Sequence, residues 1–147
     1  MRVLLFIIAF HPLLTIAQPS YVCTPTATTG FNYKTTGRWE SGNFNPSHSW
    51  LLRPANEDER LRSKEYPYVV VEVGSKVISS ACKNEPSLGQ TLNCSGMFMD
   101  FSFLLGESNK YAITSFGSYF FSDELVQMLG GGTRDSMYLE HGKCSKI

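Results

Sequence analysis

The sequence predicts a mainly β protein: an antiparallel sheet curled into a small barrel or sandwich of about eight strands, with one short helix near 122–130. Three observations predict this class. Short runs of β-branched and aromatic residues recur along the chain, turn-forming Gly, Pro, Asn and Ser residues separate them, and the clearest run alternates between apolar and polar residues. Short antiparallel strands bury their apolar faces by curling the sheet on itself.

Residues 1–17 have the pattern of an export signal. Arg2 precedes an apolar run, and Thr15 and Ala17 are small residues at the −3 and −1 positions of a signal-peptidase site. The unbroken apolar run 3–10 is much shorter than the roughly 20 residues that a membrane span needs. We therefore expect residues 18–147 to form a single β-rich domain in the periplasm or outside the cell, without stable membrane insertion.

The first strands are expected at 21–33, from Trp39 to the Gly42–Pro46 turn region, and at 49–53. Gly37 suits the hairpin turn 35–38, because glycine adopts positive φ without strain. The stretch 56–65 mixes acidic and basic residues, so we expect it to be a solvated loop.

The middle of the chain predicts a central strand and a half-buried strand. Residues 68–74 are almost all apolar, as expected of a strand buried on both faces, and the strand 76–82 follows a Gly74-Ser75 turn. In the expected strand 96–103, four large apolar residues share one face: Met97, Met99, Phe101 and Phe103.

The last third is expected to contain a turn at 104–109, a returning strand at 110–121, the helix and a final strand at 136–144. Ser122 can cap the helix start, and Gly130 can end it. The helix is expected to be about two turns long.

Four cysteines follow the signal: Cys23, Cys82, Cys94 and Cys144. An even number in an exported chain indicates two disulfides, and three pairings are possible. The turn-formers between Cys82 and Cys94 favour that pair, which leaves Cys23 for Cys144. Zinc binding is disfavoured, because the chain has no Cys-x-x-Cys spacing.

Charge and composition exclude several function classes. The full chain has 13 basic and 13 acidic residues, and loss of Arg2 with the signal leaves 12 basic ones. A near-neutral chain without a basic run is not typical of a nucleic-acid-binding protein. We expect a monomer with no cofactor and no metal.

The sequence assigns no catalytic residue. His48 lies in the turn-rich "NPSHS" and is expected to be exposed, whereas His141 shares the face of Met137 and Leu139 on the last strand, where a hydrogen-bonded structural role is expected. Glu72 and Asp100 interrupt apolar strands and are expected to face outward. No Gly-x-Ser-x-Gly surrounds a serine.

Three stretches resemble a family of small uncharacterised bacterial exported proteins. They are "CTPTATTGFNYKTTGRWESGNF", "VVVEVG…AC…LNCSGMFMDFSF" and the terminal "YLEHGKCSKI", similar to the family's Glu-x-Gly-Lys-Cys-Ser. The chain departs from the family at 122–132, which is longer than usual, and at His141, where an aliphatic residue is typical. The resemblance implies an exported β protein cross-linked by disulfides, and it implies no activity and no functional residue.

The leading hypothesis is an exported, non-enzymatic binding module that presents turns and edge strands to a protein or envelope ligand. The candidate contact residues are Trp39, Tyr66 and Tyr119, because aromatic residues beside turns are favoured at interfaces, together with His141 on the last strand. Core packing is the alternative, and more common, role for each of the three aromatic residues. One alternative is a small hydrolase of envelope polymers using Asp100, Glu72 or His141. Another is a small-molecule carrier barrel, which an interior filled by Met97, Met99, Phe101 and Phe103 would exclude.

Overall fold

A computed structural model describes residues 18–33, 38–46, 48–62, 65–87, 90–96, 101–116 and 137–147. These residues form nine strands, a short α-helix and a 3-10 turn. The elements are β1 (Tyr21–Tyr33), β2 (Trp39–Phe44), β3 (Trp50–Pro54), α1 (Glu57–Arg62), β4 (Tyr68–Glu72), β5 (Ile78–Cys82), β6 (Leu92–Ser95), β7 (Phe101–Leu105), η1 (Glu107–Asn109), β8 (Lys110–Ser115) and β9 (Met137–Lys146).

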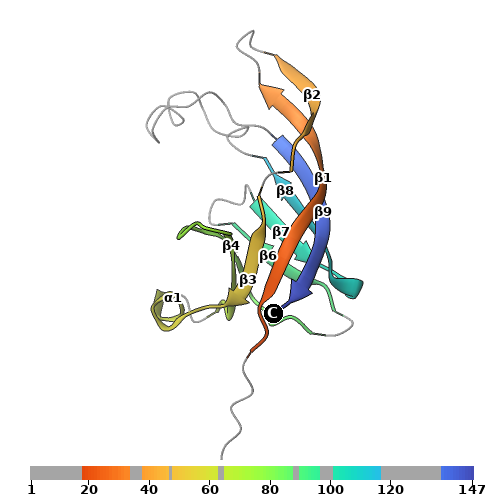
Figure 1. The fold of residues 1–147 in the computed structure, drawn as a ribbon. Helices are drawn as coiled ribbons and strands as arrows, with labels where there is room; N and C mark the ends of the chain where they lie inside the picture. Colours follow the sequence, from red (N-terminus) through yellow and green to blue (C-terminus); the bar gives the residue numbers. More distant parts are fainter. Residues whose placement is uncertain are drawn as a thin grey trace, which may run out of the picture.

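The strands form one antiparallel sheet in the order β2-β1-β3-β4-β5-β6-β7-β8-β9, and β9 also pairs with β1. This last pairing closes eight strands into a barrel and leaves β2 as an extra strand (Figure 1). Closure removes the exposed edges that an open sheet would present. The predicted mainly β class is confirmed, and the barrel is the form that the sheet takes.

Strand β1 has two neighbours along one of its edges. Residues 21–23 pair with β3, whereas residues 28–33 pair with β2, and β9 follows the opposite edge. The register with β9 shifts between Pro25 and Ala27, and such a bulge increases the local twist. The β1–β2 hairpin therefore projects beyond the closed barrel (Figure 1).

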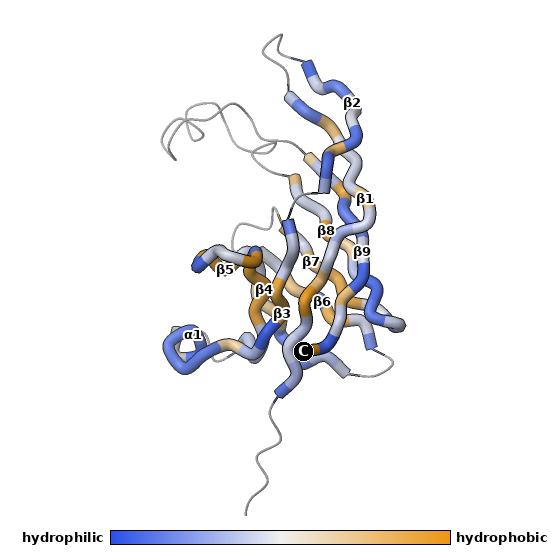
Figure 2. The backbone as a smooth tube through the Cα atoms, in the orientation of Figure 1, coloured by the Kyte–Doolittle hydropathy of each residue, from blue (hydrophilic) through white to orange (hydrophobic). Residues whose placement is uncertain are grey.

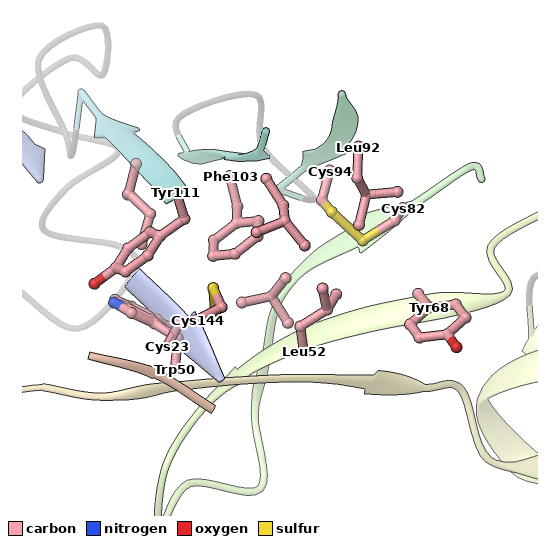
Figure 3. Close-up of a cluster of buried hydrophobic side chains, with 13 residues drawn as sticks. Cys23, Trp50, Leu52, Tyr68, Cys82, Leu92, Cys94, Phe103, Tyr111 and Cys144 are labelled. Carbon is pink, nitrogen blue, oxygen red and sulfur yellow. A yellow bond between two sulfur atoms is a disulfide. The ribbon is translucent and has the colours of Figure 1, made fainter. Parts of the chain in front are cut away.

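The barrel interior is packed with side chains from all eight closing strands (Figure 3). Strand β4 is hydrophobic along most of its length (Figure 2). Large residues such as Tyr68, Phe103 and Ile113 are fully buried in the interior. Both predicted disulfides are confirmed: Cys23–Cys144 joins β1 to β9, and Cys82–Cys94 joins β5 to β6. In each disulfide the two cysteines are direct cross-strand partners.

Gly142 allows β1, β8 and β9 to approach closely. A Cβ atom on Gly142 would overlap the backbone oxygen of Thr24 and lie 2.6 Å from Cε1 of Tyr111, its cross-strand partner. The Tyr111 ring thus covers the glycine, which is one way in which sheets stabilise a glycine within a strand.

Gly142→Ala is expected to lower the free energy of unfolding by about 1–3 kcal/mol, because the added methyl group meets backbone that cannot move aside. Gly42→Ala on β2 is the matched control, since the nearest atom to its Cβ would be Asn32 Nδ2 at 3.8 Å. Urea unfolding of both variants measures the difference. Equal midpoints for the two variants would contradict the close approach at Gly142.

The strand expected at 96–103 is wrong in its bounds. Strand β6 ends at Ser95, which pairs with Ser102 of β7, and the Gly96 N–H donates to the Phe101 oxygen at 2.6 Å. The chain therefore reverses direction between these two strands. The alternation did not reveal this reversal, because an apolar run that continues from one strand into the next can have the same pattern as a single strand.

The expected loop 56–65 is also wrong, since α1 lies within it. Asn56 Oδ1 accepts a hydrogen bond from the Glu59 N–H at 2.9 Å, and the Glu59 carboxylate accepts one from the Asn56 N–H at 2.7 Å. This reciprocal pair is the arrangement of a capping box. Arg53 also donates to both Glu59 carboxylate oxygens at 2.8 Å. Glu59 thus anchors a helix that its charged composition alone does not predict.

The hydrogen bonds from Arg53 lower the pKa of Glu59, although partial burial opposes the shift. A lowered folded pKa adds stability that is fully present above the unfolded value of about 4.3 and is lost as pH falls through the folded pKa. We expect Glu59→Gln to destabilise the protein by about 1 kcal/mol at pH 7 and by less at pH 3. Urea unfolding at both pH values tests this, with Glu57→Gln as the control in the same helical turn. An equal loss at both pH values would contradict it.

Several expected features lie outside the described residues. They are the export signal 1–17, the central part of the hairpin turn (residues 35–37), the second half of the strand 110–121, the helix 122–130, and the side chains of Met97, Met99, Asp100 and Tyr119. These expectations stay predictions.

Candidate functional site

A half-open cavity of about 570 Å³ lies at the end of the barrel where β1 begins and β9 ends; we call it the base pocket. Its lining comes from the start of β1 and the segment before it, the β5–β6 loop and the start of β6, the end of β7 and the β7–β8 turn, and the last residue of β9. The lining residues are Pro19, Tyr21, Pro86, Ser87, Gln90, Leu92, Leu105, Gly106, Glu107, Ser108, Asn109 and Lys146. A volume of this size is typical of small-molecule sites.

The base pocket has buried apolar residues and an exposed polar rim. Leu92 and Leu105 are 3% and 5% exposed and belong to the barrel core. The exposed lining residues are all polar, and among them Lys146 is basic and Glu107 is acidic. Burying an apolar group of a ligand against the leucines while its polar groups bind at the rim is the usual design of a ligand site.

Hydrogen bonds from several elements hold the segment 18–20, which supplies one wall. The hydroxyl of buried Tyr68 donates to the Pro19 oxygen at 3.0 Å, and the Ile147 N–H donates to the Ser20 oxygen at 2.9 Å. Gln18 donates to Glu85 at 2.7 Å and accepts from Arg60 at 2.9 Å. Burial raises the pKa of Tyr68, so its hydroxyl remains a donor at neutral pH.

Both disulfides lie directly behind the pocket walls. Tyr21 and Lys146 are cross-strand partners, two residues from the partners Cys23 and Cys144. Side chains two residues apart on a strand share a face, so Tyr21 and Lys146 stand beside this disulfide. Leu92 likewise lies two residues from Cys94 on β6. The covalent bonds therefore restrict the strands that carry these three lining residues.

The β7–β8 turn supplies another part of the rim. Ser108 and Asn109 have φ of 62° and 56°, and the Lys110 N–H donates to the Glu107 oxygen. Two successive positive φ values define the tight turn that best matches the twist of a β-hairpin. The turn thus presents the Ser108 and Asn109 side chains from a short, hydrogen-bonded backbone.

A second polar cluster lies inside the barrel around Glu140, which is 3% exposed. Its carboxyl group accepts hydrogen bonds from Trp50 Nε1 at 2.7 Å, from the Tyr111 hydroxyl at 2.9 Å and from Thr28 Oγ1 at 3.1 Å. Figure 3 shows the Trp50 nitrogen and the Tyr111 hydroxyl on the same side of the core. Burial and the negative charge of Glu140 raise the pKa of Tyr111 well above its ordinary value.

This cluster joins β1, β3, β8 and β9 through one side chain. The three donors are neutral groups in the described part of the chain, and the geometry satisfies both carboxyl oxygens. A buried polar group with its hydrogen bonds made is a structural element in most proteins. We therefore assign Glu140 to the stability of the barrel and not to the ligand site.

The residues that the sequence marked as contacts lie on separate elements. Trp39 is half-buried on β2, where its ring packs edge-on against Tyr33 with centroids 5.2 Å apart. Tyr66 is half-buried before β4, and Tyr119 lies outside the described residues. None of the described three lines the base pocket.

The expected structural role of His141 is wrong, because the Met137/Leu139 face of β9 is the outer face. His141 is exposed and Leu139 is 48% exposed, whereas Glu140 and Cys144 are buried. The signal that could have shown this is parity along the strand. Once Cys144 is placed in the core, Glu140 and Gly142 must face inward with it.

The hydrolase candidates do not meet in the described residues. Glu72 at the rim of β4 binds His48, with Nδ1 and Oε1 2.5 Å apart and side chains 40% and 57% exposed. His48 is exposed, as expected, and an exposed contact of this kind contributes no more than about 1 kcal/mol. His141 lies on β9, and Asp100 is outside the described residues.

The described part of the barrel interior does not resemble a carrier cavity. Phe103 is fully buried in the core, and the half-buried Phe101 packs against Trp50 with ring centroids 5.2 Å apart. Ser80 Oγ, also buried in the interior, makes no hydrogen bond among the described residues. Met97 and Met99, which were expected to complete this filling, lie outside them.

Within the described ranges, no cluster of three or more His, Cys, Asp or Glu side chains could hold a metal ion. No helix in those same ranges is long and apolar enough to cross a membrane. No family model, curated protein sequence or solved structure matches the chain. The resemblance to a bacterial exported family therefore stays a prediction.

Proposed function

We propose that the protein is an exported, non-enzymatic binding module that takes a small polar ligand in the base pocket. The observation that carries the proposal is the set of disulfides and hydrogen bonds that hold the walls of this pocket. Its walls stand beside both disulfides, its N-terminal segment is held by hydrogen bonds from α1, β4 and the C-terminus, and its rim is a tight turn. Sites that are fixed before binding lose less entropy when the ligand arrives.

The two disulfides are also compatible with an oxidising compartment, as the predicted export signal requires. The absence of a nucleophile–base pair around the pocket favours binding over catalysis within the described lining, which contains no histidine and no free cysteine. The ligand would be held by contacts at the rim and by apolar burial against Leu92 and Leu105.

Gly106→Phe tests the pocket without straining the backbone. Gly106 has an extended conformation (φ −98°), and a Cβ there would meet only the Lys110 oxygen, at 3.7 Å. Gly42→Phe on β2 is the matched control. We expect members of a panel of monosaccharides, dipeptides and small carboxylates to shift the NMR amide signals of residues 106–110 in the wild type and the control, but not in Gly106→Phe. Shifts that persist in Gly106→Phe, or a panel that shifts no pocket signal, would overturn the proposal.

A further inference from the structure

We propose that the ligand of the base pocket is a neutral saccharide, an inference that rests on the proposed function. The charge of the lining is the first reason. Lys146 is its basic residue and Glu107 its acidic residue, so the two balance. Sites for phosphate or other strong anions gather several positive groups. The described lining of the base pocket has one, Lys146.

The neutral hydrogen-bonding groups of the rim match hydroxyl groups. Ser87 Oγ donates to Gln90 Oε1 at 3.2 Å, which directs the other end of that amide, its NH₂, away from Ser87. The tight turn presents the Ser108 hydroxyl and the Asn109 amide. Amides offer both donors and acceptors, and a sugar hydroxyl can take either role, so each rim group finds a partner on a ring with several hydroxyls.

The apolar part of the lining matches the face of a sugar ring. Tyr21 packs partly buried against the barrel core beside Lys146, while Leu92 and Leu105 are buried. A pyranose ring has an apolar C–H face and a polar hydroxyl edge. An amphipathic aromatic ring next to polar groups suits a ligand with both properties.

The pairing of β1 and β7 disfavours an extended peptide that would add a strand beside either of them. At the base pocket, Tyr21 of β1 pairs with Leu52 and Lys146, and Leu105 of β7 pairs with Leu92 and Tyr111. Peptides that bind by adding a strand need an unpaired edge. Neither β1 nor β7 has an unpaired edge at the base pocket, so a peptide cannot extend the sheet at these two strands.

The test is a ¹H–¹⁵N NMR titration of the full, oxidised exported chain with methyl β-glucoside, N-acetylglucosamine, the open-chain polyol sorbitol and the dipeptide Ala-Ser. We expect at least one ring sugar to shift the Gln90 and Asn109 side-chain amides and the 106–110 backbone, with little effect of sorbitol, which has hydroxyls but no ring face.

Gln90→Leu and Asn109→Gly remove rim amides, and glycine keeps the positive φ of position 109. Each is expected to weaken binding of the sugar roughly three- to tenfold. Asn84→Leu, exposed in the same loop and outside the pocket lining, is the control. Equal shifts with sorbitol, or unchanged sugar affinity in both rim variants, would overturn the saccharide assignment. Shifts by the dipeptide alone would overturn it while leaving the proposed function standing, and no shift by any compound would count against both.

Discussion

Glu140→Ala is expected to lower the free energy of unfolding by at least about 3 kcal/mol. The substitution leaves the Trp50, Tyr111 and Thr28 donors without their acceptor inside the barrel. Each buried donor left unsatisfied costs about 1–3 kcal/mol, and the cavity left by the side chain adds to the loss. Urea unfolding followed by far-UV circular dichroism measures the change.

Glu140→Gln is the matched variant, because its amide keeps the shape of the carboxyl group. The amide oxygen can accept from Trp50 and Tyr111, and the Thr28 hydroxyl can turn to accept from the NH₂ group. We expect a loss of about 1–2 kcal/mol, since neutral hydrogen bonds are weaker than those to a charged group. If Glu140→Ala lowers the free energy of unfolding no more than Glu140→Gln does, the hydrogen bonds around Glu140 do not stabilise the barrel.

Replacing Cys23 and Cys144 together by alanine is expected to cost about 4–5 kcal/mol. The disulfide joins residues 121 positions apart, and the entropy that a cross-link removes from the unfolded chain grows with the length of the closed loop. Removal of this disulfide should also loosen Tyr21 and Lys146 and thereby weaken the binding of a ligand in the base pocket. Thermal and urea unfolding under non-reducing conditions measure the stability.

The Cys82→Ala/Cys94→Ala double variant is the internal comparison. Its disulfide spans 12 positions, so the same estimate gives about 3 kcal/mol. Both pairs are buried and join direct cross-strand partners, which makes loop length the main difference between them. If removal of Cys82–Cys94 lowers the free energy of unfolding more than removal of Cys23–Cys144, local packing around the sulfur atoms, and not loop closure, governs the stability that each disulfide contributes.

The strands were predictable where composition and turns agreed. The run 21–33 matches the observed bounds of β1, and the Gly74-Ser75 turn is confirmed by the positive φ of Gly74 and by the hydrogen bond from Ser75 N–H to the Glu72 oxygen. Burial on both faces of β4 is confirmed from Tyr68 to Val71. Local errors arose where one feature had two explanations. Charged residues at 56–65 suited a loop, but the capping of Asn56 and Glu59 forms α1 instead.

The base pocket and the Glu140 cluster could not be predicted in the same way. Gln90, Asn109 and Lys146 have no distinctive local pattern. They line one pocket because the barrel brings the β5–β6 and β7–β8 connections, the start of β1 and the end of β9 to the same rim. Glu140 is acidic within an otherwise alternating strand, so its burial follows only from the position of Cys144 and from donors on three other strands.

By itself the sequence determined the β class, most of the strands and the pairing of the four cysteines. Period-two alternation and turn residues are local signals of strands, and four cysteines allow only three pairings. Only the tertiary structure decided that the sheet closes, which face of β9 is inside and which side chains surround a cavity. Closure depends on the pairing of the first strand with the last, and a contact between chain ends leaves no periodic pattern in the residues that make it.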